Sequence, residues 1–154
     1  MNNFFKDSAH VLIIDKRFNS VLLTKRNDMT KLWVMPGGHL KKKESHQRAA
    51  IREVKEEIGV YLKKLDLKLI HDDTKKKIEK RVYIAYISGV NIRRSREVME
   101  ARWFSINNLP NPMSLYEKKR IQKAFYGAGV ITTKLKINIV GEILNQLINL
   151  ILRR

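Results

Sequence analysis

Residues 38–60 read GHLKKKESHQRAAIREVKEEIGV, and the five residues before them, 33–37, read WVMPG. The second half of this stretch carries three glutamates, Glu53, Glu56 and Glu57, within little more than one helical turn. Side chains three and four positions apart are neighbours on a helix, so each like-charge pair costs about 0.2–0.5 kcal/mol. We therefore expect a cation beside these carboxylates.

The same stretch predicts a helix that begins near Ser45 and ends at Gly59, because serine caps a helix start and glycine accepts the left-handed geometry of a helix end. Four apolar residues share one face of this helix and are expected in the core: Ala50, Ile51, Val54 and Ile58. The three glutamates fall together on one flank of that face. Ala49 lies among them, one turn before Glu53, and is expected to leave room for a metal ion.

Strands are expected before this helix. The apolar runs 10–14 and 21–23 predict two strands joined by a polar turn, the first buried on both faces. Residues 33–35 predict a short strand that the following proline and glycines end, and residues 41–43, three lysines, predict an exposed loop.

After the helix, alternating leucines over residues 61–70 predict a strand with one exposed face, followed by a charged turn over residues 71–77. Residues 82–87 are apolar on both alternating faces and predict an interior strand. A second helix is expected over residues 114–126.

Length and composition narrow the class of protein. A chain of 154 residues fits one domain, so a single domain is expected over residues 1–154. The absence of cysteine excludes a disulfide framework and a thiolate nucleophile, and it suits a cytoplasmic enzyme. We see no secretory signal and no apolar run of the roughly 18–20 residues that span a bilayer. The net charge of +17 attracts phosphates, nucleic acid or acidic membrane surfaces.

A C-terminal extension is expected over residues 128–154. Four of its apolar residues follow a 4-3-4 spacing that predicts an amphipathic helix: Val140, Leu144, Leu147 and Ile151. Packing on its own domain is the first interpretation of this helix. A homodimer contact is the second, and a membrane surface is the third.

The carboxylate cluster predicts a metal site. Mg²⁺ prefers oxygen ligands and is held by a few carboxylates while it keeps waters and substrate phosphates. Gly37 and Gly38 let a backbone carbonyl approach as a further ligand. Such an ion polarises phosphoryl oxygens, and a carboxylate outside its coordination shell can take a proton from water.

The stretch resembles the signature of the Nudix hydrolase family, G-x5-E-x7-R-E-U-x-E-E-x-G-U, where U is apolar. Nine positions fit this signature: Gly38, Glu44, Arg52, Glu53, Val54, Glu56, Glu57, Gly59 and Val60. The preceding strands and residues 102–110 also look like the family, so the resemblance covers most of residues 8–126. It implies an α+β fold, an α/β/α sandwich with a mixed β-sheet between helices.

The resemblance also implies a MutT-like nucleotide pyrophosphohydrolase. Such an enzyme hydrolyses a nucleoside diphosphate linked to a group X and releases a nucleoside monophosphate and phospho-X, with Mg²⁺ or Mn²⁺. It implies that Glu53, Glu56 and Glu57 bind the metal, that one of them serves as the base in some members, and that Gly37 or Gly38 offers a carbonyl.

Three further residues enter through the resemblance. Arg52 is expected to orient the glutamates and Glu44 to support the site. Many family members draw another carboxylate from a loop shortly before a Trp-Phe pair, here residues 103–104. Glu97 is the first candidate for that carboxylate and Glu100 the second.

The substrate stays open between alternatives. A proline near position 75 would resemble ADP-ribose hydrolases, and a tyrosine near positions 76–78 would resemble diadenosine polyphosphate hydrolases; residues 75–78 contain neither. The absence of cysteine argues against an isopentenyl diphosphate isomerase, a relative that uses one. A small-molecule nucleotide is the first interpretation. An RNA 5′ end is the second, because of the net charge and the basic loop 93–96. A non-catalytic nucleotide-binding or regulatory module is the third, and the three intact glutamates argue against it.

Overall fold

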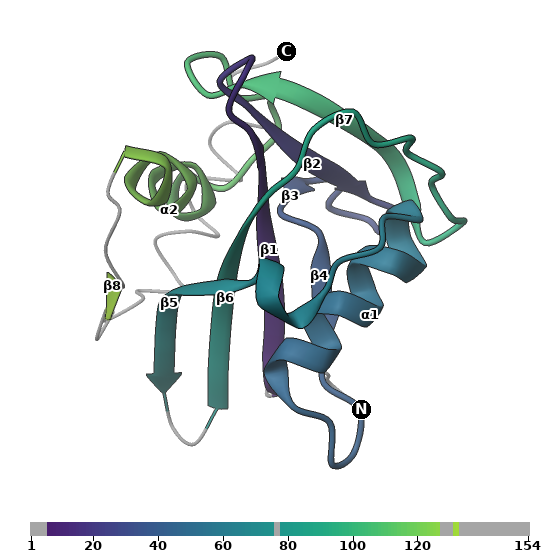
Figure 1. Cartoon of the computed structure of the whole chain (residues 1–154), viewed down its shortest axis with the longest axis vertical. Coiled ribbons are helices and arrows are strands. Elements are labelled where there is room, and N and C mark those ends of the chain that lie inside the picture. Colours follow the sequence, from purple (N-terminus) through teal and green to yellow (C-terminus); the bar gives the residue numbers. More distant parts are fainter. Residues whose placement is uncertain (1–5, 76–77, 127–130, 133–154) are drawn as a thin grey trace.

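Strand β1, Ser8–Asp15, is the central strand of a mixed sheet (Figure 1). The structure is a computed structural model that describes residues 6–75, 78–126 and 131–132. Over the described residues the order of the strands is β3-β2-β1-β6-β5-β8, with β4 also paired to β1 and β7 to β2. The other strands are β2 Ser20–Arg26, β3 Trp33–Val34, β4 Gly37–His39, β5 Lys68–Lys75, β6 Ile78–Tyr86, β7 Val98–Ser105 and β8 Ile131–Thr132. The helices are α1 His46–Ile58 and α2 Leu115–Tyr126.

The pairing of β1 explains why the sheet is mixed. Its C-terminal half pairs antiparallel with β2, and its N-terminal half pairs antiparallel with β4. Along its other edge it runs parallel to β6, from Ser8 opposite Lys80 to Ile14 opposite Tyr86. The predicted interior strand 82–87 is therefore confirmed for its residues up to Tyr86, and β6 begins four residues earlier.

Each face of the sheet carries its own core. Successive strand residues point to opposite faces, so Val11 and Ile13 pack with α1 while Leu12 and Ile14 pack with α2. Figure 1 shows the two helices on opposite sides of the sheet. The predicted sandwich with a mixed sheet between helices is confirmed.

Helix α1 has the predicted ends. The Ser45 hydroxyl accepts a hydrogen bond from the Arg48 N–H at 3.3 Å, and Gly59 ends the helix with a φ of 70°. The expectation for Ala49 was wrong, because this residue is fully buried in the core on the α1 side of the sheet and does not line the cavity described below. Its small size serves close packing of α1 on the sheet.

Two strand predictions need correction. Gly37 and Gly38 do not only end a strand, since they form β4 with His39. A side chain at Gly37 would place its Cβ 2.3 Å from the Ala9 carbonyl oxygen, so only glycine lets β4 lie this close to β1.

The strand expected over residues 61–70 was wrong in its first half. Residues Lys64–Asp66 form a 3₁₀ turn with Leu65 exposed, and β5 runs through most of the predicted turn over residues 71–77. The leucine alternation reported only side-chain spacing, whereas β5 is defined by backbone pairing with β6 from Lys68 to Lys75. Helix α2 is confirmed over the expected range, with the Ser114 hydroxyl accepting the Glu117 N–H at 3.1 Å.

The C-terminal prediction is largely untested. Residues 131–132 form β8, which runs parallel to β5, and the amphipathic helix expected over residues 140–151 lies outside the described residues. The single domain over residues 1–154 stays a prediction for the same reason. Within the part of the chain that the structure describes, no helix is both long and apolar enough to cross a membrane.

Candidate active site

A cavity of about 770 Å³ opens beside β4, where the start of β1 lies between the two helices. Side chains from α1, β1, β4, β6 and α2 line it, together with residues at the end of β2 and just before β7. It is the place where the signature helix meets the rest of the sheet. The residues around it divide into an acidic end and a basic end.

The acidic end is formed by Glu53 and Glu57 of α1 and by Glu97, which precedes β7. The Gly37 N–H donates a hydrogen bond to Glu57 Oε2 at 3.2 Å. A Cβ added to Gly38 would lie 2.7 Å from the carboxyl carbon of Glu53. Because Gly37 and Gly38 have no side chains, the carboxylates of Glu53 and Glu57 can lie directly against β4.

The surroundings of Glu57 disfavour the ionised form of its carboxyl group. The pKa of Glu57 is raised from 4.5 to about 8, mainly by burial and also by the neighbouring charges of Glu53 and Glu97, against the opposing effects of the Gly37 amide and of Arg26. A carboxylate in this setting is ionised readily only when a cation joins it. The repulsion from Glu53 that the sequence suggested contributes to this shift, and burial is its largest cause.

Arg52 joins the carboxylates of the signature into one network. Its Nε and Nη2 donate to the two oxygens of Glu44, each at 2.9 Å, and Nη2 also donates to the His39 carbonyl at 3.0 Å. Its Nη1 donates to Glu53 at 2.7 Å and to Glu56 at 2.8 Å. The bidentate bond to Arg52 holds the pKa of Glu44 at about 2, and the same contacts raise the pKa of Arg52. Arg52 is placed to orient Glu53.

The structure separates Glu56 from the other two helix glutamates. Glu56 is 42% exposed, forms ion pairs with Arg52 and with Lys41, and does not line the cavity. Consecutive helix residues point about 100° apart, which is enough to direct Glu57 inward and Glu56 toward solvent.

The two candidates before the Trp-Phe pair are also separated. Glu97 lines the cavity. Glu100 lies on β7, where it pairs with Lys25 at 3.0 Å and with Arg102, and it does not line the cavity. Of the two, Glu97 is therefore placed to act with Glu53 and Glu57.

The acidic end fits a hard divalent cation. In the described residues no three His, Asp or Glu side chains converge closely enough to enclose an ion by themselves. Three carboxylates nevertheless line the cavity beside Gly37 and Gly38, and the raised pKa of Glu57 marks a position where the ionised carboxylate is disfavoured unless a cation joins it. Mg²⁺ needs only a few such oxygens, because it keeps waters and substrate phosphates in its shell.

The basic end was not predicted from the sequence. It includes His10 of β1, Lys80 of β6, and Glu117 and Arg120 of α2. Burial, and then the charge of Arg120, lower the pKa of His10 to about 4. A glutamate within the buried face of α2, four residues before Ile121, was the signal that could have pointed to this end.

Comparisons with known proteins identify the family of the chain. The family model described as the NUDIX domain matches residues 5–125. The chain is 31% identical over 112 residues to an ADP-ribose pyrophosphatase of Methanocaldococcus jannaschii, covering 69% of this chain and 66% of the relative. It is 30% identical over 113 residues to a human diphosphoinositol polyphosphate phosphohydrolase 2, covering 68% of this chain and 60% of the relative. The chain thus spans slightly less than two thirds of the length of both curated relatives.

Solved structures share the fold. The crystal structure of a mutator MutT protein from Bacillus halodurans aligns with a TM-score of 0.68 at 19% identity, over 82% of this chain and 86% of that one. A MutT protein from Methanosarcina mazei aligns with a TM-score of 0.66 at 23% identity, over 81% of this chain and 95% of that one. At these identities the likeness speaks for the fold alone.

Proposed function

This chain belongs to the Nudix hydrolase family, and on that premise we propose that it hydrolyses a phosphoanhydride bond in a nucleoside diphosphate linked to a group X. The products are a nucleoside monophosphate and phospho-X, and the cofactor is Mg²⁺ or Mn²⁺. One observation carries this proposal: Glu53, Glu57 and Glu97 share the acidic end of a cavity whose remaining walls carry cationic side chains.

In this mechanism a divalent ion would be held by Glu53, Glu57 and Glu97, with Glu56 as a further ligand, and by the carbonyl of Gly37 or Gly38. When bound, it polarises the phosphoryl oxygens and lowers the pKa of water. One of the glutamates takes the proton from the attacking water.

Residues around the carboxylates position them and bind the substrate. Arg52 keeps Glu53 oriented, and Glu44 keeps Arg52 in place through its two hydrogen bonds. Arg26 lines the cavity and faces Glu57, so it is placed to bind a phosphate of the scissile diphosphate. Glu56 is kept in the proposed ligand set because its ion pairs are solvent-exposed and exchange at little cost.

A matched pair of variants tests the site. Glu97→Gln removes a cavity carboxylate, whereas Glu100→Gln removes a carboxylate three residues later that points elsewhere. We expect Glu97→Gln to lower kcat/KM by about 100-fold, and Glu100→Gln to leave it within about twofold. Equal kcat/KM values for the two variants would remove Glu97 from the site.

A substrate panel tests the reaction itself. ADP-ribose, nucleoside triphosphates, dinucleoside polyphosphates and triphosphorylated RNA are incubated with Mg²⁺ or Mn²⁺, and the products are separated by chromatography. Release of a nucleoside monophosphate supports the proposal. If no compound is cleaved with either metal, the non-catalytic nucleotide-binding module becomes the better interpretation.

One observation favours an RNA 5′ end as the second candidate substrate. The loop before β7 exposes Arg93, Arg94 and Arg96 and leads directly to Glu97 in the cavity. A single strand bound along this loop would release counterions, so its affinity would fall steeply with salt. A salt dependence no steeper for triphosphorylated RNA than for a nucleoside triphosphate would count against this candidate.

A further inference from the structure

The segment that carries Glu97 has no regular secondary structure of its own. Between the end of β6 and the start of β7, residues 87–97 form neither helix nor strand. In the part of the chain that the structure describes, the Glu97 carboxylate accepts no hydrogen bond, and this residue is exposed. Its place near Glu57 therefore depends on how the backbone around it is held.

The end of α1 anchors the middle of this segment. The Arg93 N–H donates to the Ile58 carbonyl at 2.9 Å. The Ser95 N–H donates to the backbone carbonyl of Glu57 at 2.8 Å. The last carbonyls of a helix have no partner inside the helix, so these two bonds use groups that α1 leaves free. Figure 1 shows the connection from β6 to β7 passing the end of α1. These bonds stop two residues before Glu97.

Two side chains hold the next part of the segment, and both bond the same peptide group. The Ser95 hydroxyl accepts the Glu97 N–H at 3.2 Å. Asn27, which follows the last residue of β2, donates from its Nδ2 to the Arg96 carbonyl at 3.1 Å. The carbonyl of Arg96 and the N–H of Glu97 belong to one planar peptide group. The two bonds therefore fix the orientation of this group from both of its sides.

Asn27 acts at the point where strand pairing ends. Strand β2 pairs with β7 up to Arg26, which lies opposite Val98. One residue further, the side-chain amide of Asn27 takes over from the backbone and bonds the segment that leads into β7. Asn27 and Glu97 both line the cavity. The end of β2 is thereby joined to the residue before Glu97.

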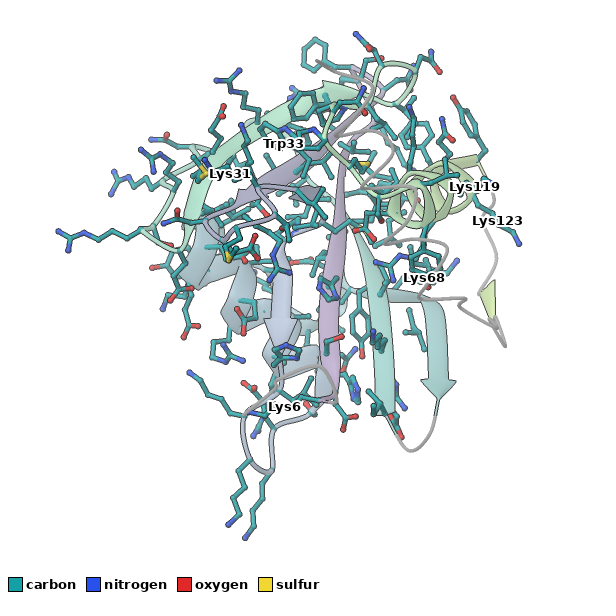
Figure 2. The ribbon with its side chains drawn as sticks, turned by 180° about the vertical axis from the view of Figure 1, so that it is seen from behind. Lys6, Lys31, Trp33, Lys68, Lys119 and Lys123 are labelled. Atoms are coloured by element: carbon teal, nitrogen blue, oxygen red, sulfur yellow. The ribbon has the colours of Figure 1, made fainter. Side chains whose placement is uncertain are left out.

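The turn that follows Asn27 is closed by its own hydrogen bonds. Asp28 Oδ1 accepts the Thr30 N–H at 2.9 Å, and the Asp28 carbonyl accepts the Lys31 N–H at 3.2 Å. Figure 2 shows Lys31 on the side of the fold where β7 begins. Asn27 is therefore a fixed point from which the segment before β7 can be held.

We propose that Asn27 and Ser95 are positioning residues, which hold the peptide group between Arg96 and Glu97 so that the Glu97 carboxylate stays at the acidic end of the cavity. They act through Glu97 and not on the metal ion itself. This inference rests on the proposed function, in which Glu97 is a metal ligand. Groups behind a metal ligand orient it and thereby set the affinity for the metal.

Mn²⁺ binding without substrate tests the inference in the absence of turnover. Free Mn²⁺ is measured by electron paramagnetic resonance while the protein is titrated. We expect Asn27→Ala to weaken Mn²⁺ binding by about fivefold or more, because a hydrogen bond that orients a ligand is lost. Asn91→Ala is the matched control, since Asn91 is exposed in the same segment and does not line the cavity. Its affinity should stay within about twofold of the wild-type value.

A double-mutant cycle separates positioning from a general structural role. In Glu97→Gln the carboxylate is absent, so Asn27→Ala should weaken Mn²⁺ binding by only about twofold or less in this background. A loss of equal size with and without the Glu97 carboxylate would overturn the inference, because Asn27 would then act elsewhere in the fold. A direct contact between Asn27 and the substrate would change kcat/KM but not the affinity for Mn²⁺ alone.

Ser95 gives a second test that does not depend on the folding of Asn27→Ala. Ser95→Ala removes the acceptor of the Glu97 N–H, whereas Ser95→Thr keeps a hydroxyl at the same place. We expect Ser95→Ala to weaken Mn²⁺ binding by about fivefold and Ser95→Thr to stay within about twofold of the wild-type value. Equal affinities for the two variants would contradict the role of Ser95.

The outcomes separate this inference from the proposed function. Cleavage of nucleotides together with wild-type Mn²⁺ affinity in Asn27→Ala and Ser95→Ala would overturn the inference and leave the hydrolysis standing. Coupling between Asn27 and Glu97 in Mn²⁺ binding, without cleavage of any compound of the panel, would support the positioning role and refute the hydrolysis.

Discussion

Replacing Glu57 by glutamine is expected to stabilise the metal-free protein at pH 8 while abolishing its stabilisation by divalent cations. The pKa of Glu57 rises from 4.5 in an unperturbed chain to about 8 in the fold. Between these values the folded protein binds more protons than the unfolded chain, so the free energy of unfolding falls as pH rises through this window.

The magnitude follows from the shift. A change of pKa from 4.5 to about 8 makes the ionised form of Glu57 roughly 5 kcal/mol less favourable in the fold than in the unfolded chain. Between pH 5 and pH 8 this corresponds to a loss of about 3 kcal/mol of stability. Glutamine cannot ionise, and its amide oxygen can still accept the Gly37 N–H, so the variant should not show this loss.

Urea denaturation at pH 5 and pH 8, in EDTA and then in Mg²⁺, measures both effects. Glu56→Gln is the control, because the pKa of Glu56 shifts in the opposite direction. Partial burial tends to raise this pKa, but the neighbouring Arg52 and Lys41 lower it overall. Ionised Glu56 contributes to the free energy of unfolding, and this contribution is lost only as the pH falls below the pKa of the unfolded chain. The control should therefore keep the wild-type dependence of stability on pH between pH 5 and pH 8. The reasoning fails if Glu57→Gln and the wild-type protein lose stability equally over this range.

Four further outcomes are expected. Arg52→Lys should lower kcat/KM by about tenfold or more, measured with the best substrate of the panel, because lysine cannot bond Glu44 through two nitrogens. Gly38→Ala should weaken Mn²⁺ binding by about tenfold or more in a calorimetric titration, because the new Cβ would displace the Glu53 carboxylate; wild-type affinity would refute this. Ser45→Ala should cost about 1 kcal/mol in urea denaturation through loss of the α1 cap. Leu12→Ala, at a fully buried position of β1, should cost about 2–5 kcal/mol in the same assay, and a cost below 1 kcal/mol would contradict the packing described.

Helix α1 shows how far local sequence signals reach. Ser45, the apolar spacing and Gly59 act within a few residues of each other, so they predict the two ends and the buried face of the helix without knowledge of the fold. The prediction differs from the structure at Ile51, which is only partly buried, and at Ala49, which was placed on the carboxylate flank although the structure buries it in the core. A residue at the border of two helix faces is assigned by what packs against it, and that neighbour is a distant strand.

Strand β5 shows the opposite case. Apolar and polar residues alternate only weakly along β5, and many of its residues are charged. The side-chain pattern therefore predicted a turn over most of this strand. The strand exists because its backbone pairs with β6. Backbone hydrogen bonds are the same for every residue except proline, so side-chain patterns report them poorly.

By itself the sequence determined the family signature, the helix that carries it and the expectation of a cation near three glutamates, because all of these depend on residues within one short segment. Only the tertiary structure decided which acids share the cavity. It brought Glu97 and not Glu100 to Glu53 and Glu57, and it left Glu56 outside. It also added the basic end, where Arg120 of α2 faces β1. The physical reason is that these groups meet through strand pairing and helix packing between segments far apart in the chain, and no local spacing encodes that geometry.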